Sequence, residues 1–322
     1  MINISPINNK MDDCLYGSIL TVISKWRSID IEMVGADAWG FEFTRPCSAG
    51  AAGDLGLIWN RVHAFQCDSW KSMETYYGVK VVWNYTETRE ESLSIIEYEL
   101  KNSRPVLTYL NSCYCPWHPR RNEENMHFCL ITGIDEENQI FYCDDPSLDI
   151  YNEVLPIGLF KQGCGPCITF QKSVVYSRTV DWRDVVGSAL NRLGSGESGA
   201  FYAMRQLAKE LEDEIKNCLD MPFWLEKPIP VVINVNLLQK GRIYFAITLN
   251  YLAQQYRIRS LLPIAERLVE VAKKWNSISF MVFKARLNQE DRATLMKIPA
   301  KIIEIADFEE ETAMKLARVL NS

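Results

Sequence analysis

The sequence feature that most constrains the fold is a change in hydrophobic pattern near residues 176–180. Before it, short apolar runs alternate with polar turns; after it, apolar residues recur at the three- and four-residue spacing of helices. The helical spacing is seen in WRDVVGSALNRL, GAFYAMRQLAKELEDEIKNCL, YFAITLNYLAQQY, LLPIAERLVEVAKKW and EEETAMKLARVL. A chain of 322 residues has room for two ordinary domains. We therefore expect a first domain over 1–178 and a helical C-terminal domain over 179–322.

The first half mixes predicted helices with predicted strands. Residues 13–27 place apolar side chains on one helical face, and Asp12 or Asp13 can cap its start. A strand at 79–83, a helix over 89–101 and a strand at 105–110 follow. The runs HFCLITGID and QIFYCDDPS flank the polar turn EEN, which predicts a β-hairpin. These elements together predict an α+β fold.

Charge and hydropathy exclude two classes of partner. The formal net charge is −6, whereas binding of nucleic acid needs a basic surface. No run approaches eighteen apolar residues, and the start lacks the basic and apolar segments of a signal peptide. We expect a cytoplasmic protein that binds neither nucleic acid nor membrane, and its ten scattered cysteines are then expected to be mostly reduced thiols.

Three residues of the first half form a candidate catalytic set. Cys14 is expected in the first turn of a helix, where backbone N–H groups and the helix dipole favour a thiolate. His127 opens the first strand of the predicted hairpin, and Asp144 and Asp145 end the second. Because the start of one antiparallel strand lies beside the end of its partner, one of these carboxylates should reach His127. This is the logic of a thiol nucleophile, an imidazole base and an orienting acid.

Each residue also has a plainer interpretation. A cysteine on an apolar helix is usually part of the core, and a histidine that begins a strand is more often structural than catalytic. The DDP sequence is also what a simple turn at the end of a strand requires. Only the agreement of order, spacing and expected context favours catalysis.

The segments MDDCLYGSIL and HFCLITGIDEENQIFYCDDPS resemble the cysteine-peptidase fold of bacteriocin-processing peptidase domains. More closely, they and the helical segments GAFYAMRQLAKELE and RIYFAITLNYLAQQY resemble the butirosin biosynthesis protein H-like acyltransferase family. This resemblance implies a papain-like catalytic domain followed by a mostly helical domain. It also implies transfer of an acyl or aminoacyl group from an acyl-carrier-protein thioester to an amine, in the biosynthesis of an antibiotic, peptide or other natural product.

The resemblance assigns roles to individual residues. Cys14 matches the nucleophile, His127 the base and Asp145 the orienting acid, and no cofactor or metal is implied. Peptidases of this fold carry a Gln six residues before the cysteine, which helps to form the oxyanion hole, and this chain has Asn8 there. Leu15, the second residue assigned to the oxyanion hole, follows the nucleophile in place of the Gly common in the peptidases, a departure that favours the transferase branch.

Two further cysteine patterns are candidates for a redox site and a zinc site. CGPC at 164–167 has the letters of a thioredoxin motif, but the flanking sequence predicts a loop that enters a strand instead of opening a helix. Cys113, Cys115, Cys164 and Cys167 offer four thiolates, yet the C-x-C spacing is unusual for zinc. We therefore expect no metal at these positions.

The leading hypothesis from the sequence is a thiol acyltransferase that forms an acyl-enzyme on Cys14. A hydrolase, either a peptidase or a thioesterase, would use the same three residues. The third hypothesis is a non-catalytic binding or scaffolding protein in which Cys14 is merely buried.

Overall fold

A computed structural model of the chain describes residues 2, 14–26, 31–44, 58–64, 72–173, 180–217, 225, 229–287 and 292–322. The chain divides into two compact units, each built from two segments. The first unit comprises Met1–Ile31 and Met73–Ser177, and the second comprises Glu32–Ser72 and Arg178–Ser322.

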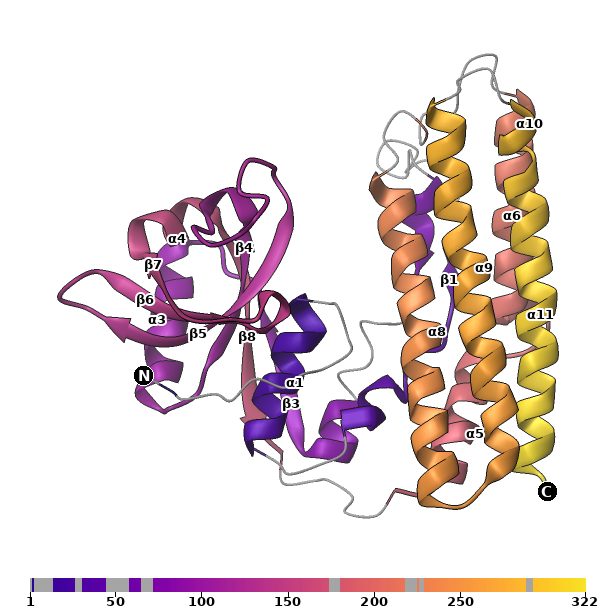
Figure 1. The fold of residues 1–322 in the computed structure, drawn as a ribbon, viewed down its shortest axis with the longest axis horizontal. Coiled ribbons are helices and arrows are strands. Elements are labelled where there is room, and N and C mark those ends of the chain that lie inside the picture. The colour runs from indigo at the N-terminus through magenta and orange to yellow at the C-terminus, as the bar shows by residue number, and fades with distance from the viewer. Residues whose placement is uncertain are drawn as a thin grey trace. The chain divides into compact units, whose positions relative to one another are not determined.

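The first unit is built on an antiparallel sheet. Among the described residues, six strands pair in the order β3-β8-β4-β5-β6-β7 (Figure 1). The strands are β3 (Val79–Asn84), β4 (Val106–Asn111), β5 (Met126–Asp135), β6 (Ile140–Asp145), β7 (Ile150–Pro156) and β8 (Cys164–Lys172). Its helices are α1 (Cys14–Trp26), α3 (Arg89–Lys101) and α4 (Ile157–Gly163), with single turns η4 (Met73–Tyr77), η5 (Ser112–Tyr114) and η6 (Pro146–Leu148).

The two faces of this sheet are covered by different helices. On one face Trp26 of α1 meets Phe170 of β8 edge-on, with ring centroids 6.3 Å apart. On the other face a buried cluster joins Ile96 of α3 and Phe160 of α4 to alternate residues of the strands, such as Cys143. Because side chains alternate along a strand, neighbouring residues of β4, β5 and β6 point to opposite faces.

Several predicted elements lie where the sequence indicated. Helix α3 spans Arg89–Lys101, and the Thr88 side chain caps it by accepting the backbone N–H of Glu91. The predicted hairpin is the pair β5 and β6, in which Leu130 lies opposite Asp144. The expected α+β architecture, an antiparallel sheet with helices and then a mostly helical region, is confirmed. The sequence did not predict β7 or α4, which have seven residues each.

The second unit is mostly helical. It contains α5 (Trp182–Leu193), α6 (Ala200–Asn217), α8 (Ile229–Gln255), α9 (Leu262–Leu287), α10 (Arg292–Leu295) and α11 (Lys297–Leu320). Helix α9 packs against both α8 and α11, and α11 also packs against α6, which gives the bundle seen in Figure 1. The longer helices bury residues three and four apart, such as Leu207 and Leu211 of α6, as the sequence pattern predicted.

The described residues between 32 and 72 belong to the compact unit of these helices, whereas the sequence pattern predicted that they belong to the 1–178 domain. Its described elements are η1 (Ile31–Gly35), η2 (Ile58–Arg61) and the short paired strands β1 (Glu42–Phe43) and β2 (Val62–His63). A Cβ atom at Gly35 would collide with the backbone carbonyl of Tyr244 in α8, so only glycine allows this close approach.

A buried polar network fixes this segment to the bundle. Glu309 of α11 accepts hydrogen bonds from the indole N–H groups of Trp39 and Trp275, at 2.7 and 2.9 Å. The guanidinium of Arg242 in α8 donates to both Glu309 oxygens, each at 3.0 Å, and to the carbonyl of Gly40. A buried carboxylate and guanidinium are tolerated here because partners satisfy both groups.

None of the helices in the described ranges is both long enough and apolar enough to span a bilayer.

Candidate active site

Helix α1 brings Cys14 to the site. The helix begins at Cys14, and residues three and four apart along it, including Ile19, Val22 and Ile23, are fully or almost fully buried. The apolar spacing of the sequence therefore explains both the helix and the face that it buries. The thiol of Cys14 is free and half-buried, at the end of the helix where backbone N–H groups point outward.

Strands β5 and β6 bring His127 and Asp145 together. His127 is the second residue of β5, and Asp145 is the last residue of β6. Their antiparallel pairing puts these two strand ends side by side, although the residues are 18 positions apart in sequence. Nε2 of His127 lies 2.6 Å from Oδ2 of Asp145, and both side chains are buried.

Asp145 is held by three hydrogen-bond donors. Besides His127, Trp117 donates its indole N–H to Oδ2 at 3.0 Å, and Ser147 donates its hydroxyl to Oδ1 at 2.8 Å. Burial alone would raise the pKa of Asp145. The hydrogen bond and charge of His127, together with the hydrogen bonds from Trp117 and Ser147, outweigh burial and lower that pKa. Asp145 is therefore a fixed anion.

The imidazole of His127 links this anion to Cys14. Burial lowers the pKa of His127, but the hydrogen bonds with Asp145 and Cys14 and their charges outweigh it and raise the pKa to about 10. Because Nε2 faces Asp145, Nδ1 is the ring nitrogen left for the thiol. The ring is therefore placed to exchange a proton with Cys14 while Asp145 fixes its orientation.

Asp144, the other carboxylate that the sequence analysis considered, faces elsewhere. Its Oδ1 accepts the backbone N–H of Asn152 at 2.7 Å, and Lys25 is the nearby cation. Burial raises the pKa of Asp144 against both of these influences. Adjacent strand residues point to opposite faces, so only one of the two aspartates can meet His127.

Two residues that the sequence analysis did not assign to the site border His127. The rings of His118 and His127 lie 4.6 Å apart between centroids, and Nδ1 of His118 accepts the backbone N–H of Arg120. Trp117 stands beside His118 in the loop between β4 and β5. The CPWHPRR segment was visible in the sequence as a Pro-flanked loop, but nothing in its pattern indicated contact with Asp145.

Cys115 is the third residue of a group that has the donor atoms for a cation. In the part of the chain that the structure describes, the donor atoms of Cys115, His127 and Asp145 all lie within 4.8 Å of one another. A cation there would have to displace the 2.6 Å bond between His127 and Asp145. Burial raises the pKa of the Cys115 thiol, which opposes the thiolate form that a metal needs.

The other three cysteines that were weighed as zinc ligands lie in different environments. Cys113 is exposed, whereas Cys164 is half-buried and Cys167 is buried. All three are free thiols, and burial raises the pKa of Cys167 to about 11. The CGPC motif lies within strand β8 directly after helix α4, the reverse of the strand-to-helix order of a thioredoxin motif.

The structure describes one of the two predicted oxyanion residues, Leu15. Asn8 lies outside the described residues. Leu15 is the second residue of α1 and half-buried, at a position where backbone N–H groups point out of the helix end. Their roles, like the catalytic roles of Cys14, His127 and Asp145, remain predictions.

Comparison with known proteins narrows the interpretation of this geometry. Residues 48–162 match the model of the Peptidase_C39 like family. The matched segment contains His127 and Asp145 and ends before the helical unit resumes at residue 178. No curated protein matches the chain. The similarity to the Peptidase_C39 like family supports a papain-like fold and a cysteine-dependent enzyme, and it leaves hydrolase and transferase open.

Proposed function

We propose that the protein is a thiol acyltransferase that moves an acyl or aminoacyl group from a thioester to an amine. The observation that carries this proposal is the hydrogen-bonded series Cys14, His127 and Asp145, in which a fixed anion orients an imidazole against a thiol. Such a series is what nucleophilic catalysis by cysteine requires.

The reaction proceeds in two halves. In the first, the Cys14 sulfur attacks the thioester carbonyl carbon as a thiolate whose proton is held by His127. The donor's carbon–sulfur bond then breaks, and His127 returns the proton to the departing thiol. In the second half, an amine attacks the Cys14 thioester and gives a proton to His127, and Cys14 leaves as the thiolate paired with that imidazolium. Asp145 holds the imidazole in one tautomer throughout.

An acyl-carrier protein is the donor that best fits this chemistry, since its phosphopantetheine arm presents the acyl group as a thioester. The resemblance to the butirosin biosynthesis protein H-like family supports this donor and a place in natural-product biosynthesis. We assign recognition of the carrier or acyl group to the second unit. Its histidine, His63, is exposed on β2. That unit otherwise offers carboxylates and lysines that pair within a helix or between helices, such as Lys274 of α9 with Glu270 of α9 and Glu304 of α11.

A hydrolase is the second candidate. The observation that favours it is the similarity of residues 48–162 to a family named for peptidases. The same three residues would serve, with water in place of the amine in the second half-reaction.

The partition of product between amide and free acid tests the proposal. The full-length protein is incubated with a short acyl thioester of N-acetylcysteamine, with and without a primary amine, and both products are quantified by mass spectrometry. Thioester consumption that requires the amine and yields amide supports the transferase. Equal consumption without amine, yielding free acid, supports the hydrolase. No turnover, together with Cys14 no more reactive toward iodoacetamide than the other cysteines, indicates the non-catalytic alternative.

A further inference from the structure

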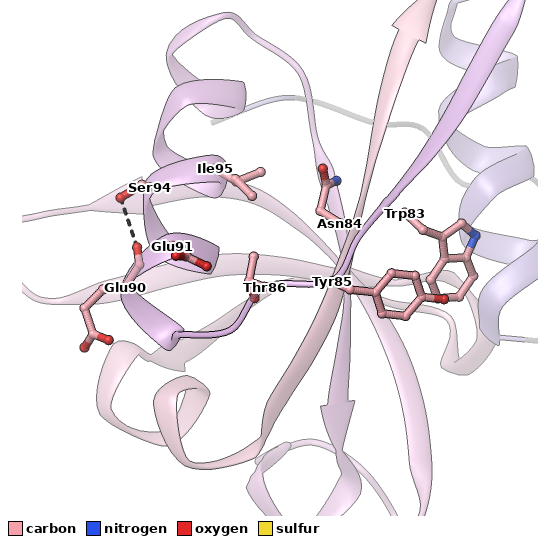
Figure 2. Close-up of a pocket in the computed structure, with 8 residues that line it drawn as sticks. All are labelled: Trp83, Asn84, Tyr85, Thr86, Glu90, Glu91, Ser94 and Ile95. Carbon is pink, nitrogen blue, oxygen red and sulfur yellow. Dashed lines mark hydrogen bonds between the residues drawn. The ribbon is translucent and has the colours of Figure 1, made fainter.

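Exposed apolar side chains are arranged differently in the two units. Among the described residues of the first unit they come from separate elements: Tyr98 from α3, Met126 from β5 and Val154 from β7. Tyr85, just after β3, is also exposed, and its ring stacks on that of Trp83 with centroids 5.9 Å apart (Figure 2). Apolar residues scattered in this way are ordinary on a protein surface. The second unit differs, because one of its helices carries several of them.

Helix α9 has an apolar stripe on its solvent side. Its five exposed large apolar residues lie on a series of positions that alternate four and three residues apart. This spacing aligns side chains along one edge of a helix and is the spacing of a coiled-coil seam. The eight positions of the series are here called the outer stripe: Leu262, Glu266, Val269, Lys273, Asn276, Phe280, Phe283 and Leu287.

The outer stripe is separate from the core of the bundle. The opposite side of α9, which includes Leu268, Trp275 and Val282, is fully buried where the helix packs against α8 and α11. Phe280 is 67% exposed and Leu287 is 89% exposed, although both are apolar. The stripe runs the whole length of α9, whose 26 residues span about 39 Å. A continuous exposed apolar surface of this kind marks contact with another protein.

The exposed charges at the two ends of α9 are opposite in sign. Glu266 and Glu270 are exposed in its first half, whereas Lys284 and Arg286 are exposed near its end. Glu270 lies 3.6 Å from Lys274 of the same helix, but Glu266, Lys284 and Arg286 form no ion pair with another described residue. A partner helix with the same charges in reverse order would meet opposite charges at both ends. A second copy of α9 that runs antiparallel is such a partner.

The order of residues in the outer stripe suits the same partner. The series of spacings is symmetric about its centre, so two antiparallel copies would bring apolar residues level with apolar residues and the central polar residues level with each other. Polar residues within an apolar seam fix the register of paired helices. The residues that lie level are Leu262 with Leu287, Glu266 with Phe283, Val269 with Phe280 and Lys273 with Asn276.

Charge decides between antiparallel and parallel packing. In the antiparallel arrangement Glu266 of one copy lies level with Phe283 of the other and therefore beside Lys284. In a parallel arrangement Glu266 would face Glu266 and Lys284 would face Lys284, and like charges repel. A two-fold axis through the centre of the stripe forms each favourable contact twice.

We propose that two copies of this chain associate through the outer stripes of α9, packed antiparallel about a two-fold axis. Burial of the five apolar side chains in both copies would remove on the order of 1,000 Å² of surface from water, which reaches the size of a specific interface. Such a dimer does not depend on acyl transfer, so its absence would leave the proposed function untouched.

Sedimentation velocity of the full-length protein, over about 1–100 μM, tests the dimer. The mass should rise from the 37.1 kDa of one chain toward twice that value. Phe280→Glu places a charge in the seam twice per dimer, and we expect it to raise the dissociation constant about 10-fold or more. The matched control is Met314→Glu on α11, which changes another exposed apolar residue and should dimerise as the wild type does. Circular dichroism checks that both variants keep the helical content of the wild type.

Charge reversal tests the antiparallel arrangement. Glu266→Lys and Lys284→Glu should each weaken the dimer about 3- to 10-fold, because each turns two attractions into repulsions. The two residues are far apart on one helix, so only pairing between copies lets the double variant recover the affinity of the wild type. A double variant as weak as either single variant would contradict the antiparallel packing.

Two results would overturn the dimer itself. One is a wild type that remains a monomer over the whole concentration range, and the other is a Phe280→Glu variant that dimerises as tightly as Met314→Glu. If the wild type is a monomer and Phe280→Glu slows only acyl transfer from a carrier protein, the outer stripe binds the carrier and the dimer is wrong.

Discussion

Asp145 accepts hydrogen bonds from His127, Trp117 and Ser147, and this concentration of donors makes it the residue on which the site depends. Asp145→Asn keeps the size of the side chain and removes its charge. We expect the pKa of His127 to fall well below about 10, because burial of the ring then acts against Cys14 alone. Titration of the imidazole signals by NMR measures this, and the exposed His63 is an internal control.

The pair of His127 and Asp145 also determines how the stability of the fold depends on pH. The raised pKa of His127 stabilises the fold fully below pH 6.5, its ordinary pKa, and this contribution is lost as pH rises toward about 10. The lowered pKa of Asp145 stabilises the fold above 3.8 and is lost as pH falls below it. The stability difference between wild type and Asp145→Asn should therefore shrink between pH 6.5 and 10. A difference in melting temperature that stays constant over this range would contradict the ion pair.

At the scale of elements, the loop between β4 and β5 supports the site, because it carries Trp117. Trp117→Phe keeps most of the ring and removes the N–H that Asp145 accepts at 3.0 Å. A hydrogen bond to a charged group is worth about 1.5–3 kcal/mol, so we expect acyl transfer to slow roughly 10-fold or more. Trp182→Phe in α5 is the matched control and should leave the rate unchanged. Equal rates in the two variants would show that Trp117 is only a packing residue.

The sequence predicted the elements that carry the site because each has a strong local pattern. Helix spacing in α1 and α3, and the hairpin of β5 and β6, follow from periods of 3.6 and 2 residues. From these, the approach of His127 to an aspartate at 144 or 145 could be inferred. The sequence could not show which aspartate meets His127, nor that Trp117 donates a hydrogen bond to it. Strand register and loop conformation are set by non-local packing.

At the scale of the whole molecule, the sequence pattern did not reveal that 32–72 belongs with the helices. The polar groups that join them are distant in sequence: Trp39, Arg242 and Glu309. A fragment ending at residue 178 would therefore keep Trp39 and Trp59 while losing the helices that bury them.

Glu309→Ala tests that connection. It would leave the buried Arg242 without its carboxylate, and the cost of breaking a buried pair is about 3–5 kcal/mol in the free energy of unfolding. The control Glu304→Ala removes an exposed partner of Lys274 and Lys301 and should cost about 1 kcal/mol or less. Urea unfolding of full-length variants measures both costs. If the two are equal, the buried network contributes little to this unit.

The central claim, a Cys14 acyl-enzyme, is tested most directly by intact-protein mass spectrometry after incubation with an acyl thioester. The wild type should gain the mass of one acyl group, located to Cys14 by peptide mapping, and should lose it when a primary amine is added. Cys14→Ala should gain no such mass and should transfer acyl groups at least about 10³-fold more slowly. An acyl group found on another residue, or full activity in Cys14→Ala, would contradict the account.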